Sequence, residues 1–337
     1  MIREVIAMLA EGRDLSPEEA TLAMQEIMDG HATPAQVGAF LMGLRLKGEK
    51  PSEIAAFARV MRHKATPIRV PVEVVLDTCG TGGDRVGTFN ISTAAALVAA
   101  GAGVHVAKHG NRSVSSRSGS ADVLEKLGVN VNADVPTVER CVCEARIGFL
   151  FAPILHGAMK HAIGPRREMG IRTVFNILGP LTNPAGARHQ LLGVFRRDLT
   201  EVMARALHEL GSRRALVVCG LDGLDEISTA SPTQVTELHE GSVRTYELDA
   251  RALGFPAARR EDLLVSSVEE SAAVIRGVLD GKRGPARDIV VLNAAAALLA
   301  AEAVADMTDG IARATQVLDS GAARDALERL ISISNSG

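Results

Sequence analysis

The feature that most constrains the fold of this chain is a series of apolar runs that stop at glycine-rich or polar loops, with helical segments between them. The clearest case is the run VEVVL at 72–76, which leads into DTCGTGGDRVGTFNIST and then into AAALVAA. VHVA at 104–107 and RALVVCG at 214–220 end in polar loops in the same way. Continuously apolar strands that alternate with helices predict an α/β fold with a mostly parallel central sheet flanked by helices.

The first part of the chain has a different pattern, in which short helices follow one another. Three helix starts combine a capping residue with proline, at Ser16–Pro17, Thr33–Pro34 and Pro51–Ser52. We therefore predict a small all-helical domain at 1–68 and an α/β domain at 69–337. The segment at about 160–187 is rich in Pro, Gly and Arg, and we expect it to cross over to the helical domain.

Composition argues against several classes of protein. Aromatic residues make up 3% of the chain and Trp is absent, which leaves few rings on which nucleotide bases could stack. The formal net charge of −3 provides no basic field for nucleic acid. The longest apolar run, 292–305, contains Glu302 and is shorter than the roughly 20 residues of a membrane span. We expect a cytoplasmic protein that binds neither nucleic acid nor membrane.

The four cysteines give no clear metal site. Cys141 and Cys143 are separated by one residue, whereas zinc sites usually have a two-residue spacer and a second ligand pair. We expect reduced, structural cysteines, as is usual in the cytosol.

The glycine-rich loop has the composition of an anion site. Gly80, Thr81, Gly82, Gly83 and Asp84 let the backbone approach a ligand with its N–H groups, and the segment 90–93 then begins a helix. A tight strand-to-helix turn with a serine cap explains the same residues, so the loop alone leaves both interpretations open.

Two further loops follow predicted strands. KHGNRS at 108–113 combines the cations Lys108 and Arg112 with neutral donors, as a polyphosphate requires. Asp222, Asp225 and Glu226 follow RALVVCG and offer the oxygen ligands that Mg²⁺ prefers. A polar surface loop and a solvated acidic turn are the simpler explanations. If the three loops meet at one sheet edge, they fit a magnesium-bridged diphosphate, and Arg166, Arg167 and Arg172 are available to a second anionic substrate.

The ordered set of motifs resembles that of the anthranilate phosphoribosyltransferases. The motifs are GTGGD, NIST, KHGNRS, SGSADVLE, RTVFNILGPLTNP and GLDGLDEIS, and the match covers nearly the whole chain. The resemblance implies transfer of a phosphoribosyl group from 5-phosphoribosyl-1-diphosphate to anthranilate in tryptophan biosynthesis. It further implies pyrophosphate as a product, two Mg²⁺ ions per subunit, and a homodimer formed through the helical domain. The sequence departs from the family at Gly157 and at Ala162–Gly164, where the family usually has proline-containing segments.

The resemblance also assigns roles residue by residue, with no general acid or base among them. Contacts to phosphoribosyl diphosphate are implied for Gly80, Thr81, Gly82, Gly83, Asp84, Thr88, Asn90, Ser92, Thr93, Lys108 and Ser120. Contacts to anthranilate are implied for Gly80, His109, Asn111, His156 and Arg166. Metal-linked positions are implied for Ser92, Asp225 and Glu226.

Two other functions are kept as alternatives. A pyrimidine nucleoside phosphorylase shares the architecture and would use inorganic phosphate and a nucleoside. A non-catalytic relative that binds nucleic acid would need a basic surface and interrupted loops, whereas this chain has a net charge of −3 and intact loops.

Overall fold

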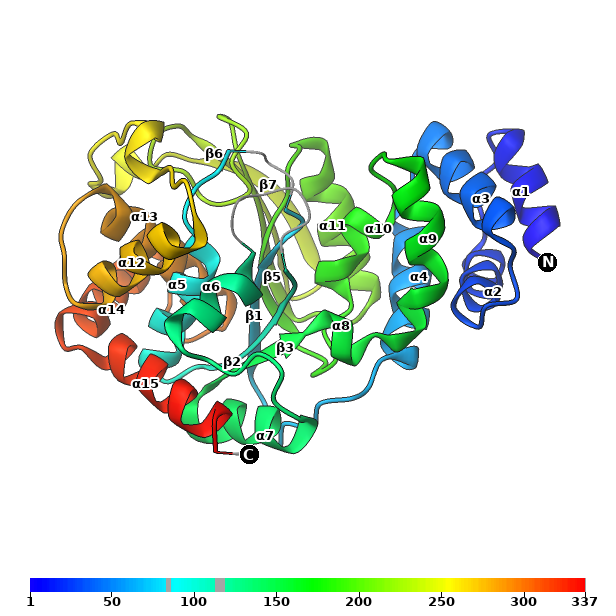
Figure 1. Ribbon diagram of the computed structural model, residues 1–337. Coiled ribbons are helices and arrows are strands. Elements are labelled where there is room, and N and C mark those ends of the chain that lie inside the picture. The colour runs from blue at the N-terminus through cyan, green and yellow to red at the C-terminus, as the bar shows by residue number, and fades with distance from the viewer. Residues whose placement is uncertain (83–85, 113–118, 337) are drawn as a thin grey trace.

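A single twisted sheet organises the larger part of the protein (Figure 1). The computed structural model describes residues 1–82, 86–112 and 119–336. The described residues form seven strands in the order β3-β2-β1-β4-β5-β6-β7. The strands are β1 (Val75–Gly80), β2 (His105–Gly110), β3 (Ile147–Phe151), β4 (His189–Gly193), β5 (Arg214–Gly220), β6 (Thr233–His239) and β7 (Ser242–Leu248). The strands β3, β2, β1, β4 and β5 pair in parallel, whereas β6 is antiparallel to β5 and β7 is antiparallel to β6. This confirms the predicted mostly parallel sheet.

Four short helices form the N-terminal part and lie at one end of the molecule (Figure 1). They are α1 (Ile2–Ala10), α2 (Pro17–Met28), α3 (Pro34–Lys47) and α4 (Pro51–Lys64). Ser16 and Thr33 complete capping boxes with Glu19 and Gln36, so two of the predicted helix starts have the predicted cap chemistry. This helical part is confirmed, whereas the domain limits at 1–68 and 69–337 stay predictions.

The predicted cross-over segment contains α9 (Lys160–Met169) and α10 (Phe175–Leu178). α9 contacts α2 and α3, and α10 contacts α4. Ala162 and Phe175 share a buried apolar cluster with residues of α1 to α4. The segment therefore packs against helices that lie far from it in the sequence.

Helices cover both faces of the sheet. One face carries α5 (Ile91–Gly101) and α13 (Pro285–Ala300), which pack on each other and on β1. α11 (Asp198–Glu209) covers β5 and β6 on the other face and contacts α4. The remaining helices are α6 (Ser120–Leu127), α7 (Val135–Arg140), α8 (Ala152–Leu155), α12 (Val268–Leu279), α14 (Met307–Asp319) and α15 (Ala322–Ser334).

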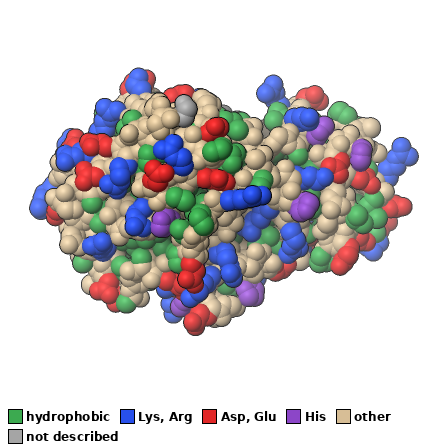
Figure 2. Space-filling model, turned by 90° about the horizontal axis from the view of Figure 1, so that it is seen from below, with side chains coloured by type: hydrophobic (Ala, Val, Ile, Leu, Met, Phe, Trp, Pro, Cys, Tyr) green, Lys and Arg blue, Asp and Glu red, His purple; other side chains and the backbone are tan. Residues whose placement is uncertain are grey.

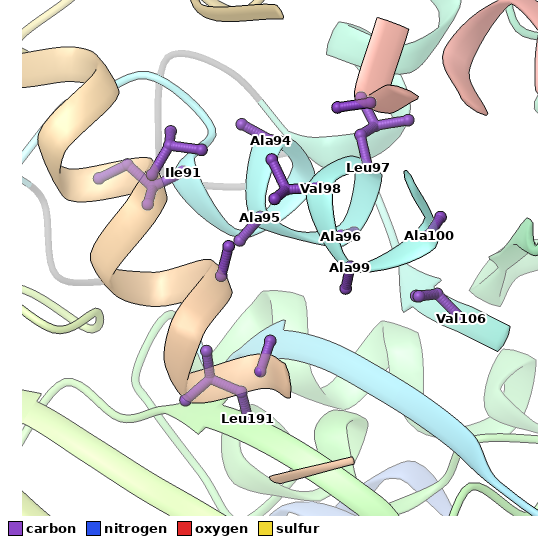
Figure 3. Close-up of a cluster of buried hydrophobic side chains, with 14 of the residues drawn as sticks. Ile91, Ala94, Ala95, Ala96, Leu97, Val98, Ala99, Ala100, Val106 and Leu191 are labelled. Atoms are coloured by element: carbon purple, nitrogen blue, oxygen red, sulfur yellow. The ribbon is translucent and has the colours of Figure 1, made fainter. Parts of the chain in front are cut away.

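Alanine dominates the contact between α5 and the elements around it. Residues 94–100 are all buried, and Figure 3 shows Ala94, Ala95, Leu97 and Val98 on the same helix, with Leu191 of β4 below them. Small side chains let helices approach closely, and full burial of each Val or Leu adds roughly 1.5–3 kcal/mol to the hydrophobic stabilisation. The N-terminus of α5 is therefore held firmly against the sheet.

The sheet ends in a polar edge strand, β7. Ser242, Arg244 and Glu247 are exposed, and Arg244 forms an ion pair with the buried Glu237 of β6. On the face shown in Figure 2, basic and acidic side chains are interspersed. None of the helices in the described ranges is long and apolar enough to cross a bilayer.

The helix starts around the glycine-rich and polar loops use different caps. Gly119 is the N-cap of α6, and Ser120 is its first residue. The alternative of a serine cap before α5 is wrong, because Asn90 occupies that position. The long apolar run at 292–305 begins inside α13, which starts at Pro285, since a proline suits the first helical turn.

Candidate active site

The site is built where the order of strands reverses. From β1 the chain continues to β2 and β3 on one side, whereas β4 lies against β1 on the other side and leads to β5. In α/β sheets, ligands bind outside the carboxyl ends of strands at such a point. Gly80 and Gly193 end β1 and β4 and are partners in the sheet register. The glycine-rich loop therefore leaves the sheet at the position that the fold favours for a ligand.

The start of the glycine-rich loop is attached to its neighbours through backbone N–H groups. Thr81 N donates to Gly193 O at 2.9 Å, and Gly82 N donates to Asp225 Oδ2 at 3.1 Å. Gly82 has a φ of +63°, which favours glycine. Gly83 and Asp84, two predicted contacts, lie outside the described residues.

The helix start beyond the loop uses side chains for capping. Asn90 Oδ1 accepts from Thr93 N at 3.2 Å and also from Thr93 Oγ1. Ser92 Oγ accepts from Lys108 Nζ at 3.2 Å. Thr88 instead forms a β-bridge with Leu264. Asn90, Ser92 and Thr93 thus lie together at the N-terminus of α5, where the helix dipole favours an anion.

Lys108 lies beneath the loop and not on its surface. Its side chain is among the largest fully buried ones, and Nζ donates to Thr78 O as well as to Ser92 Oγ. Burial lowers its pKa, which the nearby carboxylates of Asp77 and Glu226 oppose. Lys108 therefore joins β1, β2 and the start of α5 and places its side-chain nitrogen under the site.

Asp77 is a buried residue that the motif analysis missed. Its Oδ1 accepts from His109 N at 3.1 Å and its Oδ2 from Asn183 Nδ2 at 2.9 Å. Burial raises its pKa to about 6, although those hydrogen bonds and Lys108 favour the charged form. An ionisable residue inside the apolar run VVLDTCG is the signal that was available in the sequence.

The acidic loop folds over the ends of β1 and β4. A Cβ built on Gly193 would lie 1.6 Å from the Asp225 carbonyl oxygen, and one built on Gly80 would lie 2.8 Å from Asp225 Oδ2. Asn293 holds the loop from below, because it accepts from Ile227 N and donates to Ile227 O, each at 2.9 Å. Glycine in the apolar strand HQLLGVF is a sequence sign of such close backbone approach.

The three acidic residues have different roles in this loop. Asp222 is used within it, accepting from Ser228 Oγ at 2.7 Å and from Leu224 N at 3.3 Å. Asp225 reaches Gly82, and Glu226 is close enough to raise the pKa of Lys108. Mg²⁺ is commonly held by one or two carboxylates together with substrate phosphates and waters, so Asp225 and Glu226 fit that ion. A protein-only site is not present, because the described ranges contain no group of three or more His, Cys, Asp or Glu that could hold a metal.

His109 and His156 form a pair on the other side of β1. Their Nε2 atoms lie 3.1 Å apart, and His109 Nδ1 lies 3.1 Å from Gly179 O. Burial lowers the pKa of His109 to about 3 and that of His156 to about 4, so both rings are neutral at pH 7. A neutral wall of this kind suits an aromatic ligand.

Asn111 and Arg112 are occupied by contacts within the protein. Ser120 Oγ donates to Asn111 O at 3.4 Å, and Asn111 Oδ1 accepts from Arg112 N at 2.7 Å. Arg112 forms ion pairs with Asp122 and Glu125, both at 2.8 Å. The expectation that Arg112 offers its charge to a polyphosphate is therefore not supported by its position.

In the part of the chain that the structure describes, Arg166 is linked to the histidine pair through α10. Its guanidinium lies 5.0 Å from the centre of the Phe175 ring, and burial lowers its pKa. Phe175 begins α10, and the same segment ends at Gly179, which accepts from His109. Among the described residues, Arg166 makes no hydrogen bond or ion pair with His109, His156 or Asn111. A Cβ built at Gly157 or Gly164 meets nothing within 4 Å, so packing does not require glycine at these departures from the family pattern.

A separate groove carries none of the predicted site residues. It has a volume of about 610 Å³ and lies between the start of α4 and the region of α11 and β7. Its lining consists of Asp14, Lys50, Pro51, Ser52, Arg205, His208, Glu209, Gly241 and Val243. We place the candidate site at the switch point and not in the groove, because the glycine-rich loop, the N-terminus of α5 and the acidic loop meet there.

The buried histidines predict loss of stability in mild acid. An unfolded histidine takes up a proton near pH 6.5, whereas His109 and His156 do so only near pH 3 and 4. Their contribution to the free energy of unfolding is therefore present above pH 6.5. It is lost as the pH falls, because protons then bind to the unfolded chain but not to the folded one. From pH 7 to pH 5 the two cost roughly 4 kcal/mol of unfolding free energy. The pKa of Asp77 is raised to about 6, so protonation of this carboxyl between pH 7 and pH 5 favours the folded state. It offsets only roughly 1 kcal/mol of the loss.

Urea unfolding at pH 7 and pH 5 measures this loss. The variant His109→Asn/His156→Asn should lose much less stability than the wild type between the two pH values, and His63→Gln, which removes an exposed histidine, should keep the wild-type dependence. Equal pH dependence in the double variant and the wild type would show that the buried pair is not its source.

Comparisons with known proteins agree with this geometry. The model of the glycosyl transferase family helical bundle domain matches residues 3–65, and that of the a/b domain matches residues 72–324. An anthranilate phosphoribosyltransferase of Acetivibrio thermocellus is 53% identical over 336 residues, which cover 100% of this chain and 97% of the relative.

Solved structures give the same result. The anthranilate phosphoribosyltransferase of Thermus thermophilus has a TM-score of 0.94 and 45% identity, covering 98% of this chain and 99% of that one. The enzyme of Saccharomyces cerevisiae in complex with PRPP and Mg has a TM-score of 0.91 and 29% identity, covering 100% of this chain and 98% of that one. The yeast enzyme in complex with 4-fluoroanthranilate has a TM-score of 0.90 and 28% identity, with the same coverage. With its helical bundle, its switch-point loops and these full-length matches, the chain belongs to the anthranilate phosphoribosyltransferases, which are enzymes of the glycosyltransferase type.

Proposed function

We propose that this protein transfers the phosphoribosyl group of 5-phosphoribosyl-1-diphosphate to the amine of anthranilate. The products are N-(5-phosphoribosyl)anthranilate and pyrophosphate, in tryptophan biosynthesis. The observation that supports this most strongly is the meeting of Gly82, the N-terminus of α5 and Asp225 at the carboxyl ends of β1 and β4. Family membership and the yeast complexes with PRPP and Mg and with 4-fluoroanthranilate point to the same pair of substrates.

The diphosphate side of the reaction is assigned to the loops around β1. The backbone N–H groups of the glycine-rich loop and of α5 bind phosphate oxygens, with Lys108 as the buried charge. We assign contacts to Gly80, Thr81, Gly82, Gly83, Asp84, Thr88, Asn90, Ser92, Thr93, Lys108 and Ser120. Asp225, Glu226 and Ser92 would hold Mg²⁺, for which we propose two ions per subunit. When bound, Mg²⁺ neutralises the charge that develops on the leaving pyrophosphate.

The acceptor side is assigned to the histidine pair and its surroundings. Gly80, His109, Asn111, His156 and Arg166 form the anthranilate site in this proposal. Arg166 pairs with the carboxylate, and the neutral histidine rings contact the aromatic ring. The ribose carbon gains positive charge as pyrophosphate departs, and the amine attacks from the opposite face. Positioning and electrostatics therefore provide most of the catalysis, without a general acid or base.

A direct assay tests the proposal. Anthranilate fluorescence should decrease when phosphoribosyl diphosphate and Mg²⁺ are added together, with release of one pyrophosphate for each anthranilate consumed. The same mixture with a chelator should show no change. Unchanged fluorescence with Mg²⁺ present would reject the proposed reaction.

Arg166→Ala should raise the KM for anthranilate roughly 10- to 100-fold, the equivalent of one charge-assisted hydrogen bond, and change kcat little. Arg167→Ala is the matched control, because Arg167 is exposed and follows Arg166 in α9. Steady-state kinetics at saturating phosphoribosyl diphosphate measures both. An unchanged KM for anthranilate in the Arg166→Ala variant would show that Arg166 is not part of the acceptor site.

We also propose a cytoplasmic homodimer formed through the helical part. Leu22 of α2, and Met42 and Leu46 of α3, are large exposed apolar side chains, and Leu46 is 81% exposed. Light scattering should give twice the chain mass of 35.4 kDa, and a monomer mass at all concentrations would reject the dimer.

A further inference from the structure

His109 and His156 belong to a chain of hydrogen bonds that ends at a fixed backbone carbonyl. His109 is in β2, His156 follows α8, and their Nε2 atoms are 3.1 Å apart. His109 Nδ1 lies 3.1 Å from Gly179 O. This carbonyl also accepts from Thr182 Oγ1 at 2.9 Å and from Thr182 N at 3.1 Å. The chain therefore joins three separate segments of the protein.

The chain also determines which ring nitrogens carry hydrogen. A carbonyl oxygen can only accept, so His109 Nδ1 carries the proton of that ring. Because both rings are neutral at pH 7, His109 Nε2 has a lone pair, and the shared hydrogen bond requires a proton on His156 Nε2. His156 Nδ1 consequently has a lone pair and can only accept.

The lone pair of His156 Nδ1 is available to a ligand. Among the described residues, His156 has one side-chain hydrogen bond, and it is made by Nε2. In the described ranges, His156 Nδ1 is not among the fully buried side-chain nitrogens that lack a hydrogen-bond partner, so part of its surface is open. It is therefore an acceptor of fixed protonation that a molecule entering the site can reach.

We propose that His156 Nδ1 accepts a hydrogen bond from the amino group of the aromatic acceptor, and that His109 is the positioning residue that fixes this tautomer. The inference rests on the proposed function, because it concerns how the same site selects and orients an arylamine. It adds a polar role for a residue otherwise assigned to the wall of the site.

The chemistry of an ortho-amino carboxylate fits this arrangement. One N–H of anthranilate faces its own carboxylate, which leaves the second N–H to donate to His156. In the reaction, the nitrogen lone pair forms the bond to the ribose carbon, and the carbon–oxygen bond breaks with its electron pair on pyrophosphate. The nitrogen becomes positively charged, so its N–H donates more strongly, and it then loses a proton to solvent. A hydrogen bond that strengthens as this charge develops favours the transition state over the bound substrate.

Nitrogen NMR tests the tautomers without turnover. Histidine-labelled enzyme at pH 7 should show His109 protonated at Nδ1 and His156 at Nε2, with the signals assigned from His109→Asn and His156→Asn. Anthranilate added with Mg²⁺ and pyrophosphate should shift the His156 Nδ1 signal in the direction of an accepted hydrogen bond. Benzoate, which has the carboxylate but no amine, should not. Protonation of His156 at Nδ1, or equal shifts with both compounds, would overturn the inference.

Kinetics of three variants distinguishes orientation from structural support. His156→Phe keeps a ring but removes the acceptor, and it should lower kcat about 10-fold or more, with KM for anthranilate changed less than about 3-fold. His156→Asn offers an oxygen near the position of Nδ1 and should recover part of kcat. In His109→Phe, the NMR signal of His156 should show a mixture of tautomers. Equal kcat values for the Phe and Asn variants, each with a wild-type melting temperature, would reject the role.

The outcomes separate this inference from the proposed function. Wild-type enzyme that consumes anthranilate but has the wrong tautomers rejects the inference alone. Predicted tautomers and an anthranilate-specific shift in an enzyme without phosphoribosyl transfer reject the proposed reaction alone.

Discussion

Gly193→Ala is expected to lower kcat about 100-fold or more, because the added methyl group has no space. Its Cβ would lie 1.6 Å from the Asp225 carbonyl oxygen and 2.6 Å from the carbonyl carbon. The acidic loop must therefore move by more than an ångström, and misplacement of that size can cost roughly 100-fold in rate. Because Gly193 is paired with Gly80, the displacement also affects the start of the glycine-rich loop. We further expect a loss of about 1–3 kcal/mol in stability, as in other overpacked sites.

The matched control is Gly277→Ala in α12, away from the site and from the proposed dimer surface. The atoms nearest to a Cβ at Gly277 belong to the Lys282 side chain, at 3.6 and 3.9 Å, which is ordinary van der Waals contact, and alanine in a helix is about 0.5–1 kcal/mol more favourable than glycine. This variant should keep full activity and melt at the same or a higher temperature. Thermal unfolding and steady-state kinetics of both variants measure the effects. Wild-type kcat in Gly193→Ala would show that the acidic loop does not have to lie against β4 during turnover.

Asp225→Asn combined with Glu226→Gln is expected to lower kcat about 100-fold or more and to raise the Mg²⁺ concentration required. The side-chain amide oxygen introduced by Asp225→Asn can still accept from Gly82 N, so the loop should keep its fold while it loses the charge that attracts the cation. The expected size corresponds to several kcal/mol of charge stabilisation in the transition state.

An exposed acidic pair provides the control for charge alone. Asp325→Asn/Glu328→Gln in α15 makes the same two substitutions on exposed residues of a helix outside the site. When activity is measured against Mg²⁺ concentration, the concentration for half-maximal activity should rise only in the variant at 225 and 226. High Mg²⁺ should recover part of the kcat of that variant. If both double variants respond to Mg²⁺ like the wild type, Asp225 and Glu226 are not the metal-linked residues.

Much of the fold was predictable because local signals and packing agree. The capping boxes at Ser16 and Thr33 and the apolar strands before the loops all appear where the residues indicate them. The β6–β7 hairpin was not among the predicted strands, although it has local signs. Glu240 and Gly241, both with positive φ, form a two-residue turn between the paired residues His239 and Ser242. The position of the hairpin depends on pairing with β5, which is a tertiary contact.

The site was predictable as a set of loops, but not in its supporting contacts. The strand ends placed Gly82, Ser92 and Asp225 at one edge, as the rule for parallel sheets requires. The ion pairs of Arg112 with Asp122 and Glu125 depend on where α6 packs, so the sequence of the loop alone does not reveal that this charge is already paired within the protein. The contact between His109 and His156 joins β2 to the residue after α8 through side chains, which no spacing in the sequence reveals.

The polar edge strand β7 has a consequence for assembly of the protein. An exposed strand offers unpaired N–H and C=O groups to which another chain can add, and charged side chains hinder such addition. Arg244 and Glu247 are exposed on β7, and Arg244 is held by Glu237 of the neighbouring strand. A second strand laid along this edge would have to approach both charges and disturb that ion pair. We therefore expect copies of the chain to associate through helices, so that each copy keeps its own sheet. We also expect the charged edge to protect newly made chains from aggregating through their strands.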